Sequence, residues 1–277
     1  MIRIVTDSSS DISPRLAAEL GVTVMPVRIS FDTDVYYDGV DIDRKTFYRY
    51  LAKGAAVPRV EPPLLKEFRS VYSRLLKGTD QILAIHMSSR MSRTAQVARE
   101  AAKAFLGRSK ITVVDSRMIS WGLKLLVTFA AEAVQRGTSV EEIVRLIRGV
   151  IPHIYMVFFV RNLAYLERRR PRGYRTFGEA LPGLRPLLLL EDGEIVPMER
   201  LRPRGRPVER LFDFLAEFAG FEQAAVLPGR VADEAQELFE DLLEAFPDRR
   251  LDVQPYGPAL ASYLGPDAFG VGVYEGF

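Results

Sequence analysis

Short apolar segments alternate with helix-forming segments along the first half of the sequence, and each apolar segment runs into a polar loop. Three of these apolar segments cover residues 1–5, 81–87 and 111–115. Serine, threonine and aspartate are frequent in the loops that follow, and amphipathic stretches come next. Strands that alternate with helices predict a parallel sheet, in which the loops after the strands share one edge. We therefore expect the functional site at that edge.

The second half of the sequence changes this pattern. An apolar strand is predicted at residues 155–160, and Glu191-Asp192-Gly193-Glu194 is typical of a hairpin turn between two apolar runs. Helical patterns follow at residues 208–219 and 231–246, and a last strand is predicted at residues 269–274. The second half is therefore expected to contain antiparallel pairing.

The two halves together predict an α/β protein with two domains. We expect a parallel-sheet domain over residues 1–152, in which residues 22–30 are a further β-rich run. A second α/β domain with antiparallel pairing is expected over residues 153–277. A chain of 277 residues, 48% of them apolar, is long enough to bury a core in each domain.

Residue types that are absent or rare exclude several kinds of chemistry. The sequence has no cysteine and only two histidines, His86 and His153, which excludes disulfides, thiolate metal sites and thiol catalysis. It contains no phosphate-binding glycine loop, glycine-flanked serine or metal-type histidine pair. No apolar run approaches the roughly 18–20 residues that span a bilayer, and we expect no leader peptide. We expect a cytoplasmic protein that is not an enzyme and has no metal or cofactor.

Several spaced motifs resemble the DegV family. The first is the turn Asp7-Ser8-Ser9-Ser10-Asp11 after the first strand, and the next is Tyr37-Asp38-Gly39. The loop Ser88-Ser89-Arg90-Met91-Ser92-Arg93-Thr94 is similar to the serine-rich loop of the family. Further motifs follow in the family's order: Asp115-Ser116, Leu163-Ala164-Tyr165-Leu166, Leu184-Arg185-Pro186 with Gly193, and Gly265-Pro266. The resemblance extends over essentially the whole chain, and its weight comes from the order and spacing of the motifs.

The resemblance implies a lipid carrier. In the DegV family a fatty acid lies in a tunnel between two domains, hydroxyl groups hold its carboxylate, and a separate kinase subunit phosphorylates it. Burying an acyl chain is favourable by about 0.8 kcal/mol per methylene, whereas an unpaired buried carboxylate costs several kcal/mol. The carboxylate therefore needs donors such as hydroxyls and loop amides. By this resemblance Ser92 is the carboxylate-binding serine and the ligand is a long-chain fatty acid.

The sequence departs from the family at the same site. Arg93 replaces the glycine after the serine, Val60 lies where the family carries hydroxyl residues, and Tyr263 lies where it usually has histidine. If Arg59 or Arg93 points into the cavity, its guanidinium binds the carboxylate, which is the outcome that we favour. If Glu61 points inward, either the cavity favours a neutral or amine-bearing ligand or Glu61 binds a proton. A carrier of a different small apolar ligand is the corresponding alternative function. The candidate head-group residues are Ser92, Val60, Arg93, Arg59, Glu61, Tyr263 and Ser89.

Two clusters of arginine lie in the second half, from Arg161 to Arg175 and from Arg200 to Arg210. The resemblance implies that they dock an acidic kinase subunit. The candidate docking residues are Arg168, Arg169, Arg170, Arg172 and Arg202. A solvated face and a surface for nucleic acid, whose binding would weaken steeply with salt, are the alternatives. The sequence has no lysine after Lys124, so a bias toward arginine explains part of the clustering.

Other features have structural interpretations. The turn from Asp7 to Asp11 is suited either to capping the next helix or to a place near the ligand. His86 ends an apolar strand and is expected to be a hydrogen-bonded core residue. Phe158, Phe159 and the run Leu187 to Leu190 are expected in the core or along the tunnel.

Overall fold

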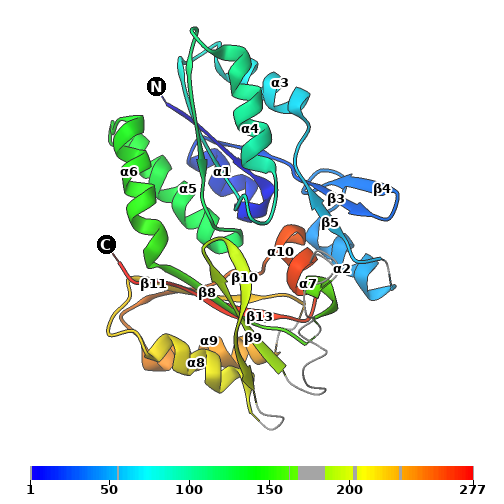
Figure 1. The fold of residues 1–277 in the computed structure, drawn as a ribbon. Coiled ribbons are helices and arrows are strands. Elements are labelled where there is room, and N and C mark those ends of the chain that lie inside the picture. Colours follow the sequence, from blue (N-terminus) through cyan, green and yellow to red (C-terminus); the bar gives the residue numbers. More distant parts are fainter. Residues whose placement is uncertain are drawn as a thin grey trace.

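In the part of the chain that the structure describes, the strands form three sheets of four, three and six strands, whose arrangement is seen in Figure 1. The computed structural model describes residues 2–54, 56–161, 163–167, 185–201, 205–230 and 233–276. The four-stranded and three-stranded sheets come from residues before 116, and the six-stranded sheet comes from residues after 153. In the view of Figure 1 the six-stranded sheet lies below the other two.

The four-stranded sheet is parallel throughout, which confirms the prediction from the alternating pattern. Its order is β2 (Val22–Met25), β1 (Arg3–Asp7), β6 (Gln81–His86) and β7 (Lys110–Asp115). The carboxyl ends of these strands therefore lie at one edge, which the loops after β1, β6 and β7 share.

Helices cover both faces of this sheet. On one face, α3 (Leu65–Leu75) and α4 (Thr94–Ala102) bury Val5, Ile82 and Ala84 in a small core of their own. On the other face lies α5 (Ser120–Gln135), and α6 (Val140–Val150) packs against α5. The short helix α1 (Pro14–Glu19) begins after Ser13, whose hydroxyl accepts a hydrogen bond from the amide of Leu16. Apolar side chains thus alternate between two cores along each strand, as buried parallel strands require.

Residues 22–30, which the sequence predicts to be rich in β-structure, are divided between two strands. The chain leaves β2 after Met25 and enters β3 (Arg28–Phe31), which belongs to another sheet. Pro26 lies between the two strands, and proline interrupts a strand because it has no amide hydrogen to donate. The antiparallel sheet that results is completed by β4 (Asp34–Tyr37) and β5 (Arg59–Glu61), with α2 (Arg44–Ala52) between them in sequence.

The six-stranded sheet is mixed, as the hairpin signal in the second half predicts. Its order is β10 (Glu194–Leu201), β9 (Arg185–Glu191), β8 (Ile154–Phe159), β13 (Phe269–Tyr274), β11 (Gln223–Pro228) and β12 (Arg250–Val253). Only β11 and β12 pair in parallel. Helices α8 (Pro207–Ala216) and α9 (Asp233–Ala245) cover its lower face in Figure 1.

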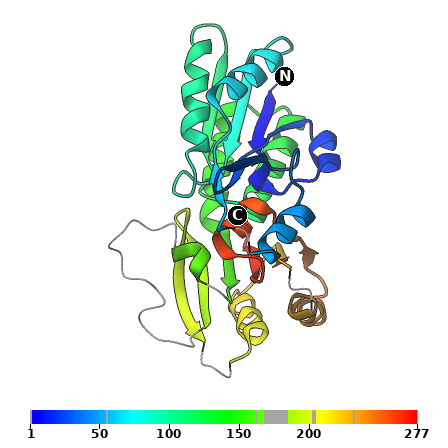
Figure 2. The same cartoon turned by 90° about the vertical axis from the view of Figure 1, so that its right-hand side faces the viewer.

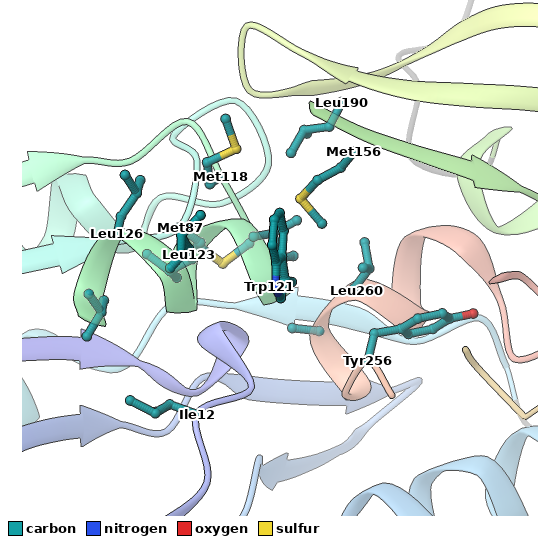
Figure 3. Packing of buried hydrophobic residues seen from close by; sticks show 14 of the residues in the cluster. Ile12, Met87, Met118, Trp121, Leu123, Leu126, Met156, Leu190, Tyr256 and Leu260 are labelled. Carbon is teal, nitrogen blue, oxygen red and sulfur yellow. The ribbon is translucent and has the colours of Figure 1, made fainter. Parts of the chain in front are cut away.

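The upper face of the six-stranded sheet shares one continuous core with the four-stranded sheet. We call this core the inter-sheet cluster, and it includes Met87, Met118, Trp121, Leu123, Met156, Leu190 and Leu260. Figure 3 shows Trp121 at its centre, with Met156 and Leu190 on one side and Leu123 and Met87 on another. Helix α10 (Pro258–Leu264), red in Figure 2, lies on this upper face together with α5.

In the described parts of the chain, every helix is too short or too polar to cross a membrane.

Candidate functional site

The loop between β6 and α4 holds Ser92 in a fixed place. The amide of Ser92 donates to the carbonyl of Ser88 at 3.0 Å, and the Ser92 hydroxyl lies 2.9 Å from the hydroxyl of Thr94. Both side chains are buried. Thr94 was not among the residues expected in the site, although it belongs to the same serine-rich loop. The structure thus pairs two hydroxyls at the edge where the sequence predicts the site.

Helix α4 begins at Thr94, two residues after Ser92. Its N-cap residue is Arg93, whose side chain makes no capping hydrogen bond. The first amides of a helix have no partner within the helix, and the helix dipole makes this end favourable for negative charge. Ser92 therefore lies where backbone amides and two hydroxyls together favour an anionic group.

Val60 lies on the inner face of β5 and its two neighbours lie on the outer face. Val60 pairs with the fully buried Ile29 and packs against the inter-sheet cluster. Side chains alternate along a strand, so Arg59 and Glu61 point the other way. They line a cavity of about 350 Å³ on the outer face, where the Glu61 carboxylate lies 2.9 Å from the guanidinium of Arg28. Neither Arg59 nor Glu61 therefore lies on the inner face of the strand with Val60.

Tyr263 joins α10 to the Ser92 loop. Its phenol donates a hydrogen bond to the carbonyl of Met91, the residue before Ser92. Every residue of α10 is buried, and the helix also contacts β5. The structure therefore brings Ser92, Val60 and Tyr263 to one region, although they come from distant parts of the sequence.

Ser89 and Arg93 have other partners. The Ser89 hydroxyl donates to the carboxylate of Asp115, and the Ser89 amide lies 3.1 Å from the same group. Arg93 is exposed and its Nε donates to the side-chain oxygen of Gln96 at 3.0 Å. These contacts do not favour a head-group role for either residue, which stays a prediction.

The apolar residues expected along the tunnel divide between the two faces of the six-stranded sheet. Phe158, Leu188 and Leu190 belong to the inter-sheet cluster. Phe159 and Leu187 belong to the separate core between the six-stranded sheet and helices α8 and α9. Successive side chains of β8 and β9 point to opposite faces of the sheet, which explains this division. Only the first group faces the region of Ser92.

Carboxyl groups gather where β1 ends, in the turn after it and just after β4. Asp7 lies 2.9 Å from Nδ1 of His86, and both side chains are fully buried, so His86 is the hydrogen-bonded core residue that the sequence predicts. Asp11 accepts a hydrogen bond from Ser120, and burial raises its pKa to about 6. Burial raises the pKa of Asp38 to about 7, although a hydrogen bond from Ser8 opposes this.

Asp11 and Asp38 line a second cavity of about 520 Å³, together with Ser8, Arg44 and Gly257. The sequence indicated the turn from Asp7 to Asp11, but not that Asp11 meets Ser120 and the segment around Gly257, because these contacts join distant residues. Across the described residues, no three acidic or histidine side chains are arranged to hold a metal ion.

The arginine clusters are only partly described. Arg168, Arg169, Arg170, Arg172 and Arg202 lie outside the described residues. Three members with described side chains are paired with glutamates. Arg161 pairs with Glu234, Arg206 with Glu209 and Glu237, and Arg210 with Glu199 and Glu217. This pairing neutralises their charge and does not favour a surface for nucleic acid.

Comparison with known proteins agrees with this architecture. A family model described as "Uncharacterised protein, DegV family" matches residues 1–276. A DegV domain-containing protein of Deinococcus radiodurans is 31% identical, and the alignment covers 98% of this chain and 97% of that protein.

Solved structures agree as well. One described as showing fatty acid binding by a DegV family protein of Thermus thermophilus is 30% identical, covers 99% of both chains and has a TM-score of 0.88. A fatty-acid-binding DegV family protein of Streptococcus agalactiae has the same fold, with a TM-score of 0.89 at 23% identity, covering 100% of this chain and 99% of that one. The parallel first sheet and the mixed second sheet are consistent with these matches, which extend over nearly the whole chain. The chain therefore belongs to the DegV family.

Proposed function

We propose that this protein binds one long-chain fatty acid where the two halves of the chain meet, and that it presents the carboxylate to a kinase subunit. Residues 1–152 and 153–277 act as two domains that supply the two walls of the site. The carboxylate lies at Ser92, Thr94 and the first amides of α4, and the acyl chain lies along the inter-sheet cluster. Tyr263 holds the Ser92 loop against the second domain.

The observation that carries this proposal is the position of Ser92. Its hydroxyl lies beside that of Thr94 at the uncapped start of α4, and the neighbouring Met91, Val60 and Tyr263 pack on the inter-sheet cluster. A fatty acid needs this combination, because its carboxylate must find donors while its methylenes leave water. The fatty-acid binding described for the Thermus thermophilus relative, at 30% identity, supports the same ligand class.

The hydrogen bonds of the site favour binding over catalysis. A serine that acts as a nucleophile needs a base within hydrogen-bonding distance. The partner of Ser92 is Thr94, which is no base, and His86 is bonded to Asp7. We therefore propose that the protein itself carries out no reaction on its ligand.

Mass spectrometry of the organic extract of the purified protein tests the ligand. We expect a long-chain fatty acid in the wild type and clearly less of it in Ser92→Ala, with an almost unchanged melting temperature. Ser73→Ala, on the exposed face of α3, is the control and should retain the lipid. An amine, a sugar or no lipid in the wild type would contradict the proposal.

Phosphate transfer tests the partner. A fatty acid kinase subunit with ATP should phosphorylate the bound fatty acid. Replacing Arg168, Arg169, Arg170 and Arg172 by alanine should weaken docking without loss of lipid, and Arg108→Ala, a change at an exposed site, should not. Unchanged docking by the four-fold variant would remove the arginines from the interface.

A further inference from the structure

The turn between β9 and β10 reaches the loop that carries Ser92. The hydroxyl of Ser88 donates a hydrogen bond of 2.6 Å to the carbonyl of Gly193, across 105 positions of the sequence. The turn has two residues between paired strands, and both have positive φ, 47° at Asp192 and 84° at Gly193. The Asp-Gly sequence supplies this geometry. A hairpin of the second half therefore makes direct contact with the head-group loop.

Ser88 transmits this contact to Ser92. Its hydroxyl accepts from the amide of Arg90 at 3.2 Å while it donates to Gly193. Its carbonyl accepts from the amides of Met91 at 3.1 Å and Ser92 at 3.0 Å. A displacement of Ser88 must therefore move the backbone of Ser92.

Two ion pairs flank the contact. Arg90 lies 3.2 Å from Glu194, and Arg117, in the loop after β7, lies 3.0 Å from Asp192. All four side chains are largely exposed, so the pairs add little stability. They do orient the turn, because each joins one side of it to a different loop of the first half.

Gly193 allows the close approach. A Cβ on this residue would lie 2.3 Å from Oγ of Ser88 and 3.3 Å from Cα of Arg117. The first distance is far inside van der Waals contact. Any side chain at this position must displace either the turn or Ser88.

We infer that the turn Glu191–Glu194 is a positioning element for the ligand carboxylate. No residue of the turn needs to touch the ligand. The turn determines the position of Ser88 through the hydrogen bond to Gly193, and Ser88 determines the position of Ser92 through its carbonyl. This inference rests on the proposed function and adds to it a residue, Gly193, that controls affinity for the carboxylate from outside the site. Displacing a donor by a fraction of an ångström weakens binding to the charged head group much more than to the alkyl chain.

Gly193→Ala tests the inference, with Gly137→Ala as a matched control. Gly137 has φ +82° and nothing within 4 Å of an added Cβ, so alanine there carries the same backbone strain without the collision. Affinities for palmitate and for hexadecanol are measured by displacement of a fluorescent fatty acid. We expect Gly193→Ala to bind palmitate roughly tenfold more weakly than Gly137→Ala does, with a much smaller loss for hexadecanol.

A double substitution separates positioning from general destabilisation. Ser88→Ala removes the Oγ that the new Cβ would meet, so adding it to Gly193→Ala should recover part of the palmitate affinity, and the two changes should be non-additive. Equal palmitate affinity in Gly193→Ala and Gly137→Ala, or equal losses for palmitate and hexadecanol, would overturn the inference. If the wild type binds neither compound, the proposed function itself fails.

Discussion

The indole of Trp121 lies against the backbone of Gly272. A Cβ on Gly272 would stand 2.4 Å from Cε3 of that ring. Trp121 comes from α5, which packs on the parallel sheet, and Gly272 comes from β13 in the six-stranded sheet. Trp121, the largest side chain of the inter-sheet cluster, thus reaches from one half of the molecule to the backbone of the other. Figure 3 shows its ring among the buried side chains of the cluster.

Gly272→Ala should destabilise the whole protein, because neither a buried ring nor a central strand can move away from the new methyl group. We expect the free energy of unfolding in urea to fall by about 1 to 3 kcal/mol. Gly220→Ala is the control, since a Cβ there meets only the end of Arg249 at 3.6 Å. Equal stability of the two variants would mean that the contact is not tight in solution.

Val60→Thr should strengthen fatty-acid binding. Threonine has nearly the shape of valine and adds a hydroxyl on the side of the inter-sheet cluster, where the sequence lacks the hydroxyl typical of the family. We expect roughly tenfold tighter binding of palmitate, from one new hydrogen bond to a charged group. Val60 is half-buried, so without ligand the added hydroxyl should cost at most about 1 kcal/mol of stability. Val60→Ala, which adds no donor, should not gain affinity, and a gain in both variants would show that space and not hydrogen bonding limits binding.

Much of the fold was predictable because local signals determine it. The alternation of apolar segments and helices predicted the parallel sheet, Asp192-Gly193 predicted the hairpin, and the last strand lies at the predicted residues 269–274. The separate three-stranded sheet was not predicted, because β5 has only three residues and its pairing with β3 is not local.

The candidate site was predictable only in part for the same reason. The order of motifs makes Ser92 a candidate, and the structure connects its loop to Tyr263 through the carbonyl of Met91. The sequence could not decide whether Arg59, Val60 or Glu61 faces inward, because a shift of one residue in a strand reverses every side chain. The register of β5 on β3, with Val60 opposite Ile29, determines it.

Tyr263→Phe should lower stability and weaken lipid retention. The substitution removes the phenol hydroxyl that donates a hydrogen bond to the carbonyl of Met91. That carbonyl belongs to the loop of Ser92. We expect a loss of about 1 kcal/mol in the free energy of unfolding. Tyr72→Phe is the matched control, because the buried hydroxyl of Tyr72 has no hydrogen-bond partner among the described residues. This control should leave stability unchanged or raise it, and a larger loss in the control than in Tyr263→Phe would contradict the assignment.

Asp38 should make the stability of the protein depend on pH. Burial raises its pKa from 3.8 to about 7 in the folded state, with the charges of Asp11 and Asp7 acting in the same direction. The folded state therefore binds the proton more tightly than the unfolded state does, and protonation stabilises the fold. The stabilisation that protonated Asp38 contributes is fully present below about pH 4. It is lost progressively as the pH rises to about 7, and above that pH the loss is constant.

Asp38→Asn removes this titration while keeping an oxygen that accepts the hydrogen bond from Ser8. The variant should be more stable than the wild type at about pH 8, by on the order of 3 kcal/mol, and the difference should vanish near pH 4. Asp34→Asn, on exposed β4, should follow the wild-type pH profile. Melting temperatures across this range measure the effect. A difference between Asp38→Asn and the wild type that stays constant with pH would show that Asp38 is charged in the folded state throughout, and that water or Arg44, which lines the same cavity, compensates its burial.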